Sequence, residues 1–228
     1  MAHRSDLRLL VLHGLRLKGA AGPDSVADAV GLPVAEVGRQ VQALESQGFA
    51  VHRDGPPTGW SLTPAGRAEH ARVVAHEIDA TGSRDTVASA YARFRALNAG
   101  VLEACSRWQV RELAGHPVRN DHRDPAYDHG VVADLVALHR RAEPVVSDLA
   151  GALERYRRYR AHLDRAIAKV ERGEGDWFTN PLMPSYHTVW FELHEDLLTT
   201  LGLDRSAEAD AGESAASAEP EAASKGVS

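Results

Sequence analysis

The sequence lacks several features that mark common classes of protein. It contains one cysteine, Cys105, which excludes an internal disulfide and a cysteine-based zinc site and agrees with a reducing compartment. Apolar residues make up 43% of the chain but form no long uninterrupted run, so no segment is predicted to span a membrane. Charges interrupt the apolar residues at the N-terminus, which favours a helix over a signal peptide. We therefore expect a soluble, cytoplasmic protein that makes no contact with a membrane.

Recognisable catalytic motifs are also missing. The chain has no Gly-rich phosphate loop, no serine nucleophile elbow and no cysteine in a nucleophile signature. The pair His194-Glu195 begins like a zinc-protease helix, but Leu198 stands where the second histidine is required. We therefore predict that the protein is not an enzyme and has no cofactor and no metal. One alternative stays open, a metal site similar to those in helical effector domains of GntR-type regulators, drawn from His122, His187, His194 and Glu195.

Acidic charge is concentrated at the C-terminus. The formal net charge is −6, and the residues from Asp204 onward hold six acids against two bases. This segment is rich in Ala, Ser and Glu, so it cannot bury enough apolar surface to offset the entropy lost on ordering. We predict a disordered tail over residues 204–228.

A helix-turn-helix pattern followed by a hairpin occupies the N-terminal part of the chain. A short helix that opens at Pro23 is broken by Gly31, and a second helix opens at Pro33. Two short strands around residues 54–57 predict a hairpin, and Thr63 is a good N-cap for the next helix. In the second helix apolar residues recur at steps of three and four, which places one stripe against a core: Val34, Val37, Val41 and Leu44.

Two segments carry a resemblance to a known family. ALESQGFAVHRD at 43–54 and GWSLTPAGRAEH at 59–70 resemble the recognition helix, wing and following helix of winged-helix regulators of the MarR type. The resemblance covers about the first 80 residues and implies double-stranded DNA as a partner, with the recognition helix in the major groove. The residues expected at DNA are Ala35, Arg39, Gln40, Gln42, His52 and Arg53.

Charge in the same region favours a different use of the fold. Glu36 would face phosphates from the second helix, and Asp54 stands in the hairpin turn where Lys or Arg is usual. Residues 1–81 carry eight Lys and Arg against nine Asp and Glu, although duplex binding normally leaves a basic footprint. The alternative is a winged-helix protein-interaction module that does not bind DNA.

The second part of the chain is predicted to be all-helical, without strands. Helix breakers gather between Gly115 and Pro125, and Pro144 is expected to start a new helix. The longest helix carries a seam that packs on another helix, of the same chain or of a second copy: Val87, Tyr91, Phe94, Asn98, Val101, Cys105 and Trp108. The predicted fold class is mainly α, with a winged helix-turn-helix domain that has a small β-wing over 1–81 and a helical effector and dimerisation domain over 83–203, before the acidic tail.

Polar and aromatic residues of the second part provide candidates for a small-molecule site. Residues 120–122 lie in a loop that either closes over a ligand or forms ordinary turns and caps. Aromatic residues that converge would line an apolar pocket, although the simpler interpretation places them in the core. Asn98 either fixes the register of packed helices or faces the cavity. The candidate effector-binding residues are Asn98, Trp108, Asn120, Asp121, His122, Trp177, Phe178, Tyr186, His187, Trp190 and His194.

The most basic stretch, ERYRRYR at 154–160, provides another candidate site. Arg155, Arg158 and Arg165 align on one helical face and could capture an anionic ligand, although a solvated helix face is the simpler interpretation. We thus expect a homodimeric transcription regulator that senses a small effector, with an anion as one candidate.

A further resemblance concerns two segments of the second part. NDHRDPAYD at 120–128 and SYHTVWFELHEDLLTTLGLDR at 185–205 are similar to a segment of actinobacterial proteins linked to phosphoenolpyruvate-utilising phosphotransferase-type domains. This resemblance carries no assigned chemistry and implies only a protein partner.

Overall fold

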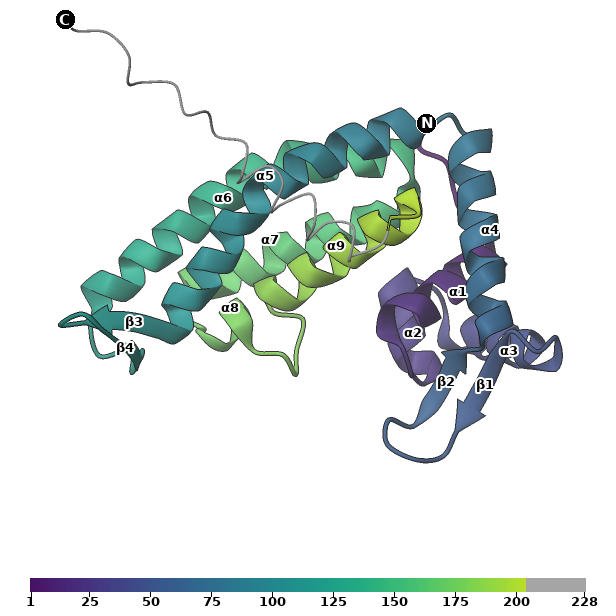
Figure 1. The fold of residues 1–228 in the computed structure, drawn as a ribbon, viewed down its shortest axis with the longest axis horizontal. Helices are drawn as coiled ribbons and strands as arrows, with labels where there is room; N and C mark the ends of the chain where they lie inside the picture. Colours follow the sequence, from purple (N-terminus) through teal and green to yellow (C-terminus); the bar gives the residue numbers. More distant parts are fainter. Residues whose placement is uncertain (204–228) are drawn as a thin grey trace, which may run out of the picture.

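The computed structural model describes residues 1–203, and the tail predicted for 204–228 lies outside the described residues. The chain is mainly helical, with 70% helix and 9% strand, and its strands form two small antiparallel hairpins (Figure 1). Buried apolar side chains gather in two clusters, one in the N-terminal elements and one in the long helices that follow. Within residues 1–203, none of the helices is long and apolar enough to cross a lipid bilayer.

Four helices and a hairpin surround the first apolar cluster. Thr63 caps the fourth helix as predicted, because its side chain accepts a hydrogen bond from Gly66 N. A Cβ atom at Gly66 would lie 1.8 Å from Phe49 O, so glycine is required where this helix starts against the hairpin. The elements are α1 (Leu7–Lys18), α2 (Pro23–Val30), α3 (Val34–Ser46), β1 (Ala50–Arg53), β2 (Gly59–Leu62) and α4 (Pro64–Ala80).

The apolar stripe of α3 is confirmed at three of its four positions. Val37, Val41 and Leu44 are buried in the first cluster. The prediction was wrong for Val34, whose exposed fraction is 45%. Val34 is the first residue of α3, where the helix has only begun to meet the core. Helical periodicity identifies a face but does not say how far the core extends along it.

The β1–β2 hairpin is fixed to α3 by one carboxylate. Glu45 of α3 accepts hydrogen bonds from His52 N at 3.1 Å and from Trp60 Nε1 at 3.2 Å. On the other edge, Ala21 and Trp60 exchange two backbone hydrogen bonds of 3.0 and 2.9 Å. The hairpin therefore holds a defined position beside α3.

Long helices surround the second apolar cluster. The α5 seam packs against α6 and α9 of the same chain, and α5 lies alongside α6 in Figure 1. The elements are α5 (Arg84–Gln109), β3 (Val110–Leu113), β4 (His116–Arg119), α6 (Pro125–Ala152), the 3₁₀ turn η1 (Glu154–Tyr156), α7 (Arg157–Glu171), α8 (Asp176–Thr179) and α9 (Tyr186–Leu201).

Two local predictions for this region were wrong. The β3–β4 hairpin occupies a stretch predicted to lack strands, and its two turn residues, Ala114 and Gly115, have φ values of 51° and 82°. Positive φ at both positions is typical of a tight hairpin turn, whereas the sequence displays only helix breakers there. Pro144 does not start a helix but lies inside α6. Burial of Val145 and Leu149 in the core stabilises the helix across the missing N–H.

Candidate functional site

The first candidate site is the exposed face of α3. Ala35, Arg39 and Gln42 are all exposed and follow one another at steps of four and three, which places them on one side of the helix. Gln40 is half-buried at the border of that face. The sequence prediction thus names a contiguous surface, with Gln40 at its edge.

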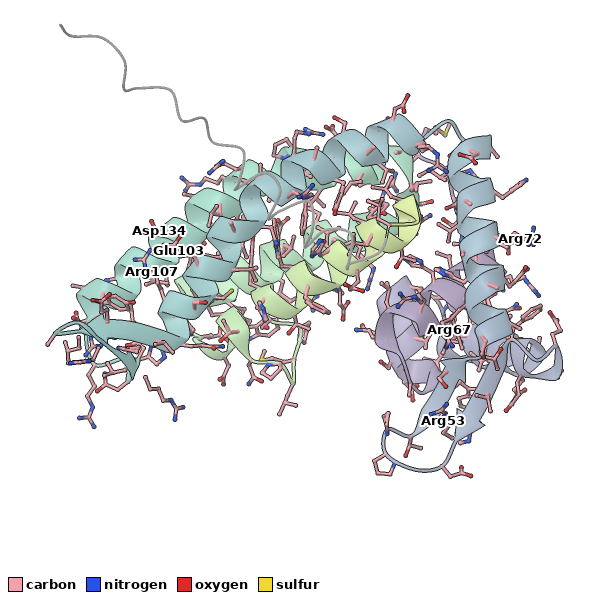
Figure 2. All side chains as sticks on the ribbon, in the orientation of Figure 1. Arg53, Arg67, Arg72, Glu103, Arg107 and Asp134 are labelled. Carbon is pink, nitrogen blue, oxygen red and sulfur yellow. The ribbon has the colours of Figure 1, made fainter. Side chains whose placement is uncertain are left out.

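The hairpin beside α3 contributes one exposed base. Figure 2 labels Arg53 on the hairpin, apart from Arg67 and Arg72 on α4. Arg67 donates to Leu62 O at 2.9 Å, and Arg72 pairs with Glu69 at 2.8 Å, so the two α4 guanidinium groups already have protein partners.

The predicted hairpin residues differ in how available their side chains are. In the part of the chain that the structure describes, neither Arg39 nor Arg53 makes a side-chain hydrogen bond or an ion pair. The ring of His52 packs edge-on against Trp60 at 4.3 Å, and its Nδ1 lies 3.2 Å from Asp54 Oδ1. Arg53 is therefore the hairpin residue best placed to meet a phosphate, while His52 is held by its neighbours.

The second candidate site is a cavity of about 1190 Å³ at the far end of the long helices. It lies where the end of α5, the strand β4 and the start of α6 face the end of α7 and the helix α8. This volume is sufficient for a small organic ligand. The residues whose chemistry matters most are Trp108, Arg119, Asn120, His122, Asp128 and Arg172.

A polar centre is built into one wall of the cavity. Asn120 is buried, and its Nδ2 donates to Asp128 Oδ1 at 2.8 Å and to Trp108 O at 3.2 Å. His122 Nδ1 lies 3.0 Å from the other Asp128 oxygen. His122 also has φ of 57°, a conformation that is uncommon for residues other than glycine and that occurs often at ligand sites.

An aromatic wall stands beside this polar centre. The ring of Trp108 is stacked on Phe178 at 4.6 Å between centroids, and it lies 4.5 Å from the ring of His122. A Cβ at Gly175 would come within 3.1 Å of the indole, so the absence of a side chain there leaves room for Trp108. The cavity therefore combines a flat aromatic surface with fixed hydrogen-bonding groups, and it can orient a planar polar ligand.

The other predicted effector residues lie outside this cavity. Asn98 Oδ1 accepts a hydrogen bond from Trp190 Nε1 at 2.9 Å within the helical core. Of its two predicted roles, Asn98 thus has the one of joining packed helices and does not face the cavity. Tyr186 is buried there too, and the ring of His194 lies 5.2 Å from Phe94. The three remaining candidates, none of which lines the cavity, are Asp121, which is exposed, and Trp177 and His187, which are half-buried. The aromatic candidates do not converge on one pocket, and Phe178, Tyr186 and Trp190 are core residues, as the simpler interpretation of the sequence has it.

The arginines predicted to capture an anion have other roles. Arg155 is buried; it forms an ion pair with Glu77 and donates to Thr200 Oγ1 at 3.1 Å. Arg158 lies over the ring of Tyr159 at 4.2 Å, and Arg165 is exposed. Arg155 belongs to the turn η1 and is buried in an ion pair with Glu77 of α4, so it lies neither on a solvated helix face nor in a site open to an anion.

Sequence reasoning did not find the buried polar network around Arg155. Asp196 of α9 is fully buried; burial alone would raise the pKa of this carboxyl, but His13, Arg155 and Arg158 lower it below its usual range. His70 Nε2 lies 3.0 Å from His13 Nδ1, and burial, then the neighbouring His13, lowers the pKa of His70 to about 3. These side chains come from distant segments, so no local pattern connects them.

Comparison of the chain with protein-family models, with curated proteins and with solved structures finds no match. The chemistry of the α3 face and of the cavity is therefore the basis for assigning a function.

Proposed function

We propose that this protein is a homodimeric DNA-binding transcription regulator whose helical part senses a small effector. In this proposal α3 is the recognition helix and β1–β2 is the wing of a winged helix, which the order of three helices, a hairpin and a fourth helix supports. The observation that carries the proposal is the exposed α3 face bearing Arg39, beside a wing that Glu45 locks in place and that presents Arg53.

In this proposal each exposed side chain has a distinct task. Arg39 reads guanine through two hydrogen bonds in the major groove, and Gln42 reads adenine in the same way. Ala35 allows close approach to the thymine methyl group. Arg53 on the wing contacts the phosphate backbone, which fixes the position of the protein without carrying sequence information.

The cavity provides the sensor, and α7 connects it to the winged helix. The first residues of α7 follow Arg155, which pairs with Glu77 of α4, whereas Glu171 at its end lines the cavity. A ligand that shifts α7 would therefore act on α4 through this ion pair. In a dimer, that shift alters the spacing of the two recognition helices and hence the affinity for an operator.

The test is selection of duplexes from a random DNA library at moderate salt, followed by titration of the enriched sequence. An inverted repeat with half-sites about one helical turn apart is the expected result. Arg39→Ala should cost about 1–3 kcal/mol of binding free energy and relax specificity at one base. Arg53→Ala should weaken binding to all DNA sequences about equally and lower the slope of log affinity against log salt by about 1. Arg140→Ala, an exposed arginine on α6, is the control and should bind as the unaltered protein does. Unchanged affinity in Arg39→Ala would refute the proposal.

The sensor role has a separate test. Compounds that release the protein from the selected DNA are screened first, and their action is then measured on Trp108→Ala. This variant should keep its DNA affinity and lose the response to the compound, because it lacks the aromatic wall of the cavity. Retention of the full response in Trp108→Ala would place the sensor elsewhere.

Two observations favour a second function, a protein-interaction module without DNA binding. The wing tip holds Asp54, whose side chain is 98% exposed, where a phosphate contact would need a base. Residues 1–81 also carry more acids than bases. Absence of DNA binding even at low salt would support this function, because a DNA-binding surface gains affinity as salt is lowered.

A further inference from the structure

A separate group of side chains lies on the neighbouring helices α6 and α7. His139 and Glu143 are one turn apart on α6, and Asp164 is on α7. Each offers one ligand atom, and the three atoms lie within 4.8 Å of one another. Among residues 1–203 no other such group is found, so the metal site suggested as an alternative by the sequence is not assembled from His122, His187, His194 and Glu195.

The distances in this group suit a metal ion. His139 Nε2 lies 3.3 Å from Asp164 Oδ1 and 3.9 Å from Glu143 Oε1. Two donors that each lie about 2.1 Å from a tetrahedral ion stand about 3.4 Å apart. The ligand atoms of Glu143 and Asp164 lie within 4.8 Å of each other, so Glu143 must move toward both partners to bring all three atoms to one ion.

In His139 and Asp164 one side-chain atom faces the proposed ion, and the other lies beside a protein partner. His139 is 8% exposed, and its Nδ1 lies 3.5 Å from the hydroxyl of the buried Tyr186, which leaves Nε2 directed at the carboxylates. Asp164 turns Oδ1 toward His139, while its Oδ2 lies 3.6 Å from Arg160 Nε. Outer partners of this kind orient the ligands in established metal sites.

The group is closed on one side and open on the other. The Glu143 and Asp164 side chains are 43% and 45% exposed, so water can reach the carboxylates and complete the coordination. Two carboxylates balance the charge of a divalent ion, and an imidazole favours Zn²⁺ or a related transition-metal ion over Mg²⁺ and Ca²⁺, which prefer oxygen ligands.

We propose that His139, Glu143 and Asp164 bind a first-row divalent transition-metal ion that links α6 to α7. This site lies outside the cavity and outside the α3 face, so it goes beyond the proposed function and is tested independently of DNA binding. A bound ion stabilises the packing of the two helices, because the unfolded chain does not hold the three ligands together.

The experiment uses the full chain, freed of metal with a chelator and then titrated with Zn²⁺ alone in a calorimeter. Co²⁺ serves as a second probe, since its visible absorption reports the geometry of its ligands. We expect one equivalent to bind, and His139→Gln and Asp164→Asn to abolish this binding. Tyr186→Phe removes only the outer partner and should weaken binding about 10–100-fold.

Matched variants separate this site from nonspecific binding. His76→Gln removes an exposed histidine on α4, and Asp148→Asn removes a surface carboxylate on α6, so both should bind like the unaltered protein. Zn²⁺ should also raise the Tm of the unaltered protein but not that of His139→Gln. If His139→Gln fails to fold, Glu143→Gln replaces it, because this half-exposed side chain is not part of the core. Failure of the unaltered protein to bind Zn²⁺ or Co²⁺, or undiminished binding by the ligand variants, would overturn the proposal.

Discussion

His13 Nε2 on α1 lies 3.0 Å from Asp196 Oδ1 on α9, and both side chains are almost fully buried. The other oxygen of Asp196 accepts a hydrogen bond from Tyr159 at 2.8 Å. This carboxylate thus lies between the N-terminal elements and the long helices, which Figure 1 shows side by side. Because buried charges tolerate few alternative partners, the network specifies how these two parts of the chain meet.

Replacement of Asp196 tests this role. Asp196→Asn keeps the shape of the side chain but removes the charge that compensates the buried Arg155. Breaking a buried ion pair on one side costs about 3–5 kcal/mol, so we expect a loss of that size in the free energy of unfolding. Denaturant titration at neutral pH measures it. The control is Asp148→Asn, which breaks an exposed pair with Arg93 and should change stability by about 1 kcal/mol or less. Equal losses of unfolding free energy in the two variants would show that the buried network stabilises the fold no more than an exposed ion pair does.

Acid should weaken the fold through His70. Its pKa is about 3 in the folded protein, chiefly because of burial, and about 6.5 in an unfolded chain. Between these values the unfolded state binds a proton that the folded state does not, so stability is full above pH ~6.5 and declines as the pH falls. The decline is about 1.4 kcal/mol per pH unit, and unfolding measured at pH 7.5 and at pH 5.5 should differ by roughly that amount from His70 alone.

A variant isolates the contribution of His70. His70→Gln cannot take up the proton, so its stability should depend less steeply on pH over the same range. An unchanged slope in His70→Gln would assign the acid sensitivity to other groups.

Two glycines should respond to alanine in opposite directions. At Gly66 a Cβ would meet Phe49 O at 1.8 Å, so Gly66→Ala must push α4 away from the hairpin, with a loss of about 1–3 kcal/mol. At Gly38 of α3 a Cβ would have no neighbour within 4 Å, so Gly38→Ala should stabilise the helix by about 0.5–1 kcal/mol. Thermal unfolding of both variants should give a lower Tm for Gly66→Ala and a higher Tm for Gly38→Ala. Similar shifts in Tm would show that the close approach at Gly66 is not constrained.

Asn120 should hold the polar wall of the cavity together. Asn120→Ala leaves Asp128 Oδ1 and Trp108 O without their shared donor, which costs about 1–3 kcal/mol for buried groups. We expect faster amide hydrogen exchange in residues 120–128 and little change in α3. Arg123→Ala, in the same loop and with a side chain that is 87% exposed, is the control and should leave exchange nearly unaltered. Equal exchange rates of residues 120–128 in the unaltered protein and in both variants would mean that other contacts fix the loop.

The features predicted well are local ones. The burial of Val37, Val41 and Leu44 follows from their spacing. The Thr63 cap follows from a hydroxyl placed three residues before the backbone N–H that donates to it. The β3–β4 hairpin was missed because its turn is Ala114-Gly115, which lacks the Asn or Asp that usually identifies such turns. Trp108, Asn120 and His122 were identified as candidates, but only the packing of α7 and α8 against them makes a cavity.

The sequence by itself determined where most helices form and which of their faces are apolar, because propensity, periodicity and capping act over a few residues. The tertiary structure alone decided the environment of the charged groups. Arg155 lies in the most basic stretch of the chain, yet its partner is Glu77, 78 residues earlier. Desolvation and pairing of a charge depend on which elements pack around it, and that information is not contained in neighbouring residues.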